Sequence, residues 1–157
     1  MTNHKIDKGL IFLILSTLIL FSVIFFYDNN KEYQYPEMNS EVYFDIYLPS
    51  YIPEGYSCHS MEIDDGFATL YFLNENENRL RFTQMLAKNF TLSIDNENHK
   101  ITEFESSKYD GYHMHPLKSD FQTLVFWDEN NFFEIMGQIT EEEIIKMADS
   151  LSLTYSP

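Results

Sequence analysis

Hydrophobic and polar positions divide the chain into a long apolar segment near its start and a series of short, alternating segments after it. Residues 10–27 read LIFLILSTLILFSVIFFY, with no charged residue and no proline. At the rise of an α-helix these residues span about 27 Å, close to the thickness of the hydrocarbon core of a bilayer. The pattern therefore predicts a transmembrane helix over residues 10–27.

The residues on either side of this apolar segment indicate its orientation. Lys5 and Lys8 precede it, whereas 24 acidic and 8 basic residues follow residue 27. By the positive-inside rule, we expect residues 1–9 to form a cytoplasmic tail and the C-terminal part to lie outside the cell. The apolar segment is longer than that of a cleaved signal peptide and has no pair of small residues after it. We expect an uncleaved single-pass anchor in the cell membrane, with a cleaved signal peptide as the alternative.

From residue 41 onward the pattern indicates one domain built of short strands. Residues 28–40 are polar, contain Pro36 and read as a linker. Val42, Phe44 and Ile46 then alternate with polar positions, as in a half-buried strand. Further strands are predicted at residues 67–73, 79–86, 90–94, 101–104, 121–127 and 132–137. We expect a twisted antiparallel sheet of five to seven strands within residues 41–157, in which residues 109–116 are the least regular part.

A short helix is predicted at the end of this domain. Thr140 and Glu143 have the spacing of a capping box, and the acidic residues 141–143 suit the positive end of a helix dipole. An apolar stripe follows at helical spacing and consists of Ile144, Ile145, Ala148 and Leu151. We expect a helix over residues 141–151 that packs on the sheet, which gives an α+β fold.

Charge and cysteine content exclude several classes of function. The formal net charge is −15, so the acidic surface repels phosphate backbones and nucleic acid is not an expected partner. Such a surface keeps a protein soluble and can attract cations or a basic partner. Cys58 is the only cysteine, which excludes an intramolecular disulfide and a zinc site built on paired cysteines.

One short segment offers candidate metal ligands. His113 and His115 are two residues apart, so their side chains share one side of an extended backbone, and Asp110 is the nearest carboxylate. The three residues could form part of a metal site. Two surface histidines in an irregular loop are the simpler interpretation, and no cofactor is expected. Aromatic residues make up 17% of the chain, and those outside the anchor either fill the core or line a groove.

Several motifs together resemble a known bacterial family. They are the run Pro49 to Tyr56, Leu80-x-Phe82-x-Gln84, Trp127 before a turn, Ile135-x-Gly137 leading into Thr140 to Ile144, and Ala148 to Leu151. Residues 41–153 resemble the extracytoplasmic domain of unknown function 4367, which is found mainly in Gram-positive bacteria. The resemblance implies an envelope domain behind a membrane anchor, with no established enzymatic activity. It also implies structural roles for Pro49, Tyr51, Pro53, Gly55, Tyr56, Gln84, Trp127 and Gly137.

These observations lead to one expected function and two alternatives. We expect a non-enzymatic module that binds a protein, peptide or lipidic ligand in the envelope and reports on its state through a partner. Some members of the resembling family restrain a sigma factor through a cytoplasmic domain, but residues 1–9 are too few for such a domain. The alternatives are a carrier of lipids or other apolar ligands and a metal-binding factor centred on His113 and His115. The oligomeric state stays open.

Overall fold

The computed structural model describes residues 35–36, 42–92 and 97–157. The predicted cytoplasmic tail, the anchor at residues 10–27 and most of the linker lie outside these residues. Among the helices of the described part, none is long and apolar enough to cross a bilayer.

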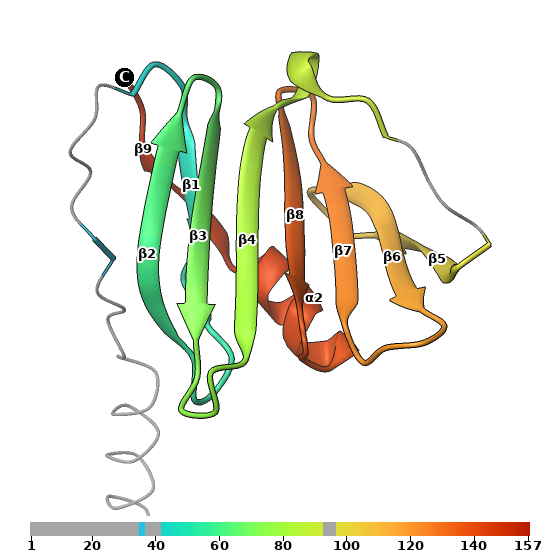
Figure 1. Ribbon diagram of the computed structural model, residues 1–157. Helices are drawn as coiled ribbons and strands as arrows, with labels where there is room; N and C mark the ends of the chain where they lie inside the picture. The colour runs from blue at the N-terminus through green and yellow to red at the C-terminus, as the bar shows by residue number, and fades with distance from the viewer. Residues whose placement is uncertain (1–34, 37–41, 93–96) are drawn as a thin grey trace, which may run out of the picture. The chain divides into compact units, whose positions relative to one another are not determined.

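Two antiparallel sheets and one α-helix form the described domain (Figure 1). The larger sheet has seven strands in the order β2-β3-β4-β8-β7-β6-β5, and the smaller one pairs β1 with β9. The strands of the larger sheet are β2 (Ser57–Asp64), β3 (Phe67–Leu73), β4 (Arg79–Leu86), β5 (His99–Glu105), β6 (Asp110–Pro116), β7 (Gln122–Trp127) and β8 (Asn131–Gly137). The remaining elements are β1 (Ile46–Pro49), a 3₁₀ turn (Ala87–Asn89), α2 (Glu141–Asp149) and β9 (Leu151–Tyr155). The α+β class and the antiparallel sheet with its C-terminal helix are confirmed.

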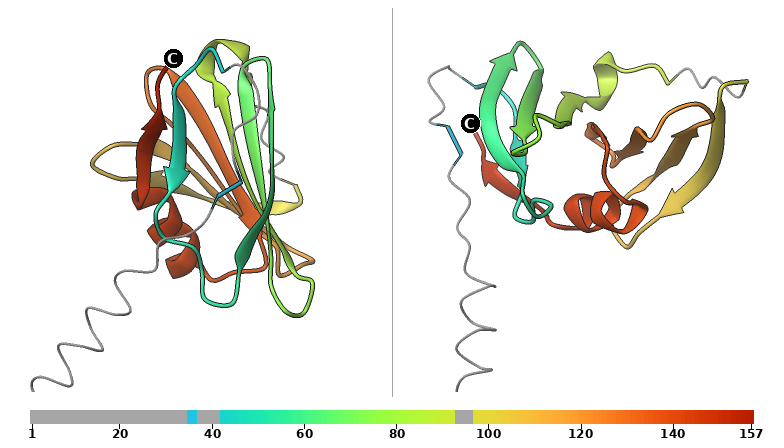
Figure 2. Two further views of the ribbon diagram at one scale, coloured as in Figure 1. Left: turned by 90° about the vertical axis from the view of Figure 1, so that its left-hand side faces the viewer. Right: turned by 60° about the horizontal axis from the view of Figure 1, so that its bottom comes forward.

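The seven-stranded sheet is curved, and helix α2 and the β1–β9 pair lie on the same side of it (Figure 2). The core lies between these layers. Its largest fully buried side chains are Phe72, Phe82, Phe126, Phe133, Ile46, Ile52, Leu70, Leu80, Leu124, Ile135, Ile144 and Met147.

Aromatic rings fill the middle of this core. Phe133 stacks on Phe126 with ring centroids 5.1 Å apart and on Phe82 at 6.1 Å, and Phe104 meets Phe126 edge-on at 6.1 Å. Offset stacking and edge-to-face contacts are the favourable arrangements of aromatic rings. Much of the aromatic content of the domain is therefore used for packing.

A buried glutamine connects the two sheets. The Gln84 side chain on β4 is fully buried, and its Oε1 accepts a hydrogen bond from the Tyr47 backbone N–H at 3.0 Å. Its Nε2 donates to the Asp45 carbonyl at 2.6 Å and to Asn131 Oδ1 at 3.0 Å. The oxygen and the nitrogen of this buried amide both bond to the backbone at β1, and the nitrogen also bonds to Asn131, which fixes the position of β1 on the sheet.

Strand β1 differs from its prediction. Val42 and Phe44 are buried, as their alternation predicts, but strand pairing begins only at Ile46. The two residues contribute to the core from a segment outside the ladder. The alternation of apolar and polar residues therefore predicted the burial of these side chains correctly, but it was wrong about their pairing with a neighbouring strand.

Two strands were missed and one segment was assigned to the wrong class. Strand β2 is an edge strand whose polar sequence, SCHSMEID, carries little apolar alternation. Strand β9 begins at Leu151, because α2 ends at Asp149 and Ser150 caps it. Residues 109–116, predicted to be irregular, contain the regular strand β6. A strand was also predicted at residues 90–94. Residues 90–92 follow the 3₁₀ turn directly and form no strand, and residues 93–94 lie outside the described part.

Candidate functional site

Strand β6 carries the two candidate histidines. In the ladder, His113 lies between Thr102 of β5 and Leu124 of β7. Because side chains alternate along a strand, His113 and His115 share the face that Leu124 presents to the core. Both histidines lie on a regular strand, so their interpretation as residues of an irregular loop is wrong. Their interpretation as surface residues is wrong for His113, which is 2% exposed, whereas His115 is partly exposed.

A glycine holds this part of β6 close to β7. Gly111 lies between Phe104 and Phe126 in the ladder, and the two rings contact each other edge-on. A Cβ at this position would lie 2.2 Å from the Val125 carbonyl oxygen and 2.8 Å from the Phe126 Cβ. Only a residue without a side chain fits here, which fixes β6 two residues before His113.

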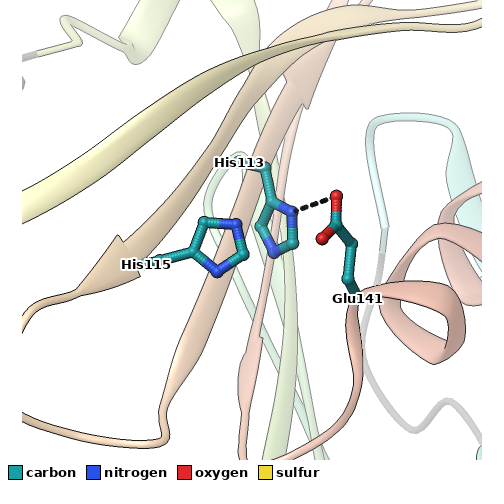
Figure 3. A group of neighbouring side chains, drawn as sticks. All are labelled: His113, His115 and Glu141. Carbon is teal, nitrogen blue, oxygen red and sulfur yellow. Dashed lines mark ion pairs between the residues drawn. The ribbon is translucent and has the colours of Figure 1, made fainter.

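Helix α2 supplies the carboxylate that faces these histidines. The Thr140 Oγ1 caps the helix by accepting a hydrogen bond from the Glu143 N–H at 3.2 Å, and the Glu143 carboxylate accepts one from the Tyr51 hydroxyl at 2.7 Å. The cap predicted at Thr140 is confirmed. Glu141 is the first residue of the helix, and its side chain points toward His113 (Figure 3).

His113, His115 and Glu141 form a group that we call the histidine cluster. Each residue offers one ligand atom, and these three atoms all lie within 4.8 Å of one another. The Nδ1 of His113 lies 3.5 Å from Glu141 Oε1, and the centroids of the two imidazole rings are 4.0 Å apart. The side chain of His113 is 3% exposed and that of Glu141 is 59% exposed.

Buried polar atoms at the cluster lack hydrogen-bond partners. Neither ring nitrogen of His113 makes a hydrogen bond of good geometry, and neither does the buried Oε1 of Gln122, the first residue of β7. Glu141 and Gln122 are the polar side chains that interact with the ring, at longer range or at an unfavourable angle. The 3.5 Å separation from Glu141 is long for a hydrogen bond. Leaving such a group unsatisfied costs about 1 to 3 kcal/mol, so the arrangement is unfavourable for stability alone.

Burial lowers the pKa of His113 below its ordinary value of 6.5, and the neighbouring His115 lowers it further. Glu141 and Gln122 oppose this shift. The imidazole is therefore neutral at pH 7 and keeps a lone pair on one ring nitrogen. A neutral imidazole beside a second imidazole and a carboxylate can bind a metal ion or donate and accept hydrogen bonds with a polar ligand.

Asp110 is not part of the cluster. It begins β6, is exposed and lies an odd number of residues from His113, so it faces the other side of the sheet. The carboxylate comes from Glu141, which follows His113 only after two strands and their turns. Sequence reasoning identified Glu141 as a helix-start residue, but no local spacing connects it or Gln122 to His113.

The motif residues of the first block stabilise the connection between β1 and β2. Pro49 ends β1, and the Tyr56 N–H donates to the Pro53 carbonyl at 3.1 Å to close a turn. Gly55 occupies the third position of that turn with φ of +83°, which glycine adopts without strain. Tyr51 reaches α2 through its hydrogen bond to Glu143.

The remaining motif residues lie in the sheet, and one of them, Gly137, pairs with Gln122 beside the histidine cluster. Gln84 is the buried amide between the two sheets, Trp127 ends β7 and its ring lies 5.7 Å from that of Tyr112. Gly137 ends β8, where a Cβ would lie 2.9 Å from the Leu80 Cδ1. These contacts fit the structural roles that we expected for the motif.

Comparison with known proteins agrees with these motifs. No curated protein and no solved structure matches the chain. One family model, described as a domain of unknown function (DUF4367), matches residues 46–151, from the first residue of β1 to the first residue of β9. The match covers more than half of the chain. The chain therefore belongs to the family of domain of unknown function 4367.

Proposed function

We propose that this chain is a single-pass membrane protein whose domain lies outside the cytoplasm, binds a ligand there and acts through a partner without catalysing a reaction. The apolar segment 10–27, with lysines before it and an acidic region after it, supports the anchor and its orientation. Membership of the family is compatible with this arrangement.

The observation that carries a binding role is the unsatisfied polar group at the histidine cluster. His113 is buried beside an otherwise apolar core, yet both of its ring nitrogens lack hydrogen-bond partners. Buried polar groups in native proteins are normally satisfied, so an exception needs an explanation, and a ligand that completes the site supplies one. Glu141 and His115 are partly accessible, so a ligand can reach His113 from solvent.

The position and state of the single cysteine support a binding role over catalysis by a thiol nucleophile. Cys58 lies on β2, and β6 is five strands away in the sheet, about 24 Å along it. Burial raises the pKa of the Cys58 thiol, so the nucleophilic thiolate is disfavoured at pH 7.

The membrane orientation is testable by cysteine labelling of the full chain in intact cells. In a Cys58→Ser background, we expect Ser107→Cys, an exposed position between β5 and β6, to react with a membrane-impermeant maleimide. Thr2→Cys in the same background should react only after lysis. Labelling of position 2 but not of position 107 in intact cells would overturn the proposed orientation.

The binding role is testable by the stability of His113→Leu, measured as the free energy of unfolding of the full chain in detergent with a chelator present. Leucine has a similar volume and no polar atom, so we expect the variant to be more stable by about 1 to 2 kcal/mol. Proteins keep such unfavourable residues where function requires them. A variant that is less stable than the wild type would show that His113 has a structural role instead.

A further inference from the structure

We propose that His113, His115 and Glu141 bind one divalent first-row transition-metal ion, with zinc as the expected metal. This inference rests on the proposed binding role and names the chemical class of the ligand. The three residues come from β6 and from the first turn of α2, so one ion would connect the sheet to the helix (Figure 3).

The types of ligand select the class of metal. Two imidazole nitrogens and one carboxylate oxygen suit zinc and its neighbours in the first transition row. Calcium and magnesium prefer sites made mainly of oxygen ligands, which this cluster does not provide. Three protein ligands also leave a fourth position of a tetrahedral zinc ion open to water or to a group from a partner.

The observed separations suit a tetrahedral ion. With metal–ligand distances near 2.05 Å, neighbouring ligand atoms in a tetrahedron lie about 3.3 to 3.5 Å apart. His113 Nδ1 and Glu141 Oε1 lie 3.5 Å apart, and no two of the three ligand atoms are more than 4.8 Å apart. Closing the cluster on an ion requires side-chain movements of about 1 Å, within the range of rotamer adjustment at partly exposed positions.

The cluster combines one fixed ligand with two adjustable ones. His113 is held by its neighbours in the strand and is almost fully buried, whereas His115 is partly buried and the Glu141 side chain is 59% exposed. Gln122 lies close enough to affect the pKa of His113, and its free Oε1 can accept the proton of the ring nitrogen that does not bind the metal. Metal-bound histidines usually make such a second hydrogen bond, which orients the ring.

The charges of the cluster also favour a cation. Glu141 contributes one negative charge to the cluster, whereas the Glu142 carboxylate pairs with Lys146 in the same helix. The acidic composition of the chain raises the local concentration of cations. Lys100, opposite His115 in the β5–β6 pair, is exposed and can extend its ammonium group into solvent.

Titration of the full chain with zinc tests this inference. The protein is purified in detergent micelles, stripped with a chelator and titrated with ZnCl₂ in a calorimeter. We expect one Zn²⁺ per chain at this site, which excess Mg²⁺ or Ca²⁺ does not displace, and Co²⁺ at the same site should give the visible absorption of a four-coordinate ion. His115→Gln and Glu141→Gln should each weaken zinc binding by at least about tenfold.

Two matched variants control for binding elsewhere. His59→Gln changes an exposed histidine on β2, and Glu142→Gln changes the exposed acid beside Glu141 in the same helical turn. Both should bind zinc as the wild type does. The inference is wrong if zinc does not bind, or if the affinity of the two cluster variants equals that of the wild type. Circular dichroism of each variant checks the fold, because His115 and Glu141 are not fully buried.

The outcome separates this inference from the proposed function. If His113→Leu is more stable than the wild type and zinc does not bind, the cluster binds a different ligand and only the metal assignment fails. If zinc binds at the cluster but the domain is labelled only from the cytoplasmic side, the metal assignment holds and the proposed location fails.

Discussion

Gln84 between the two sheets and His113 beside helix α2 are buried nitrogen-bearing side chains in very different environments. Gln84 makes three hydrogen bonds, to Tyr47, Asp45 and Asn131. His113 makes none through either ring nitrogen, although it is buried to nearly the same extent. Both side chains lie on the core face of the same sheet, so their burial alone does not distinguish them.

We interpret this difference as that between a polar residue that stabilises the fold and one that is kept for the proposed ligand. A buried amide with all of its partners stabilises one arrangement of the chain, because a shift of the strands relative to each other would break its hydrogen bonds. A buried imidazole without partners lowers stability, and its retention is explained when a ligand supplies the missing interactions. The family motifs contain Gln84 and Glu141, whereas His113 and His115 belong to none of the motifs that carry the family resemblance.

The largest effect is expected at Gln84. Gln84→Leu removes three hydrogen bonds and leaves the partly buried Tyr47 N–H and Asp45 carbonyl, and the buried Asn131 side chain, without these partners. We expect a loss of about 3 kcal/mol in the free energy of unfolding, measured by urea denaturation of the full chain in detergent. Gln122→Leu is the matched control, because its Oε1 has no partner to lose, and it should change stability by less than about 1 kcal/mol. Equal losses of stability in the two variants would show that the hydrogen bonds of Gln84 do not distinguish it from the polar groups at the histidine cluster.

A smaller loss is expected where β6 is held against β7. Gly111→Ala places a Cβ against the Val125 carbonyl oxygen and the Phe126 side chain, so the strands must separate slightly. We expect a loss of about 2 kcal/mol in the same urea assay. Gly55→Ala serves as a comparison, because its Cβ meets no neighbour and only the positive φ costs about 1 kcal/mol. If Gly111→Ala is as stable as the wild type, β6 is free to shift and does not hold His113 in place.

The smallest effect concerns Cys58, a partly buried group on the edge strand β2, two strands from the strand that carries Gln84. Burial raises the pKa of its thiol above the ordinary value of 9.0. The folded state therefore holds this proton more tightly than the unfolded state, and the associated stability is present below pH 9.0 and is lost as the pH rises through the folded pKa. The rate of alkylation by iodoacetamide should rise with a midpoint above pH 9.0 in the folded chain. A midpoint at or below pH 9.0 would show that the thiol is well solvated.

Sequence patterns predicted the parts of this fold in which local chemistry determines structure. The hairpin of β7 and β8, the Thr140 cap and the apolar face of α2 around Ile144 follow from alternation, turn residues and helical spacing. Strand β2 was not predictable in this way, because an edge strand with polar side chains on both faces has no apolar period.

The candidate site was predictable only in part. The i, i+2 spacing identified His113 and His115 as one pair on one face. It did not reveal the burial of His113, which lies beside α2 where that helix packs against β7, or the choice of Glu141 over Asp110. Those features arise from a topology that brings residues 113, 122 and 141 together, and single-sequence patterns contain no signal for such distant pairs.

The thermal midpoint of unfolding of the wild type and of His113→Leu, each measured with chelator and with excess zinc, tests the central claim most directly. The account predicts that the order of stability inverts: His113→Leu unfolds at the higher temperature in chelator, and the wild type unfolds at the higher temperature in zinc, because a ligand that binds only the folded state raises its stability. A wild type that is the more stable protein in chelator, or that gains no stability from zinc, would contradict the account.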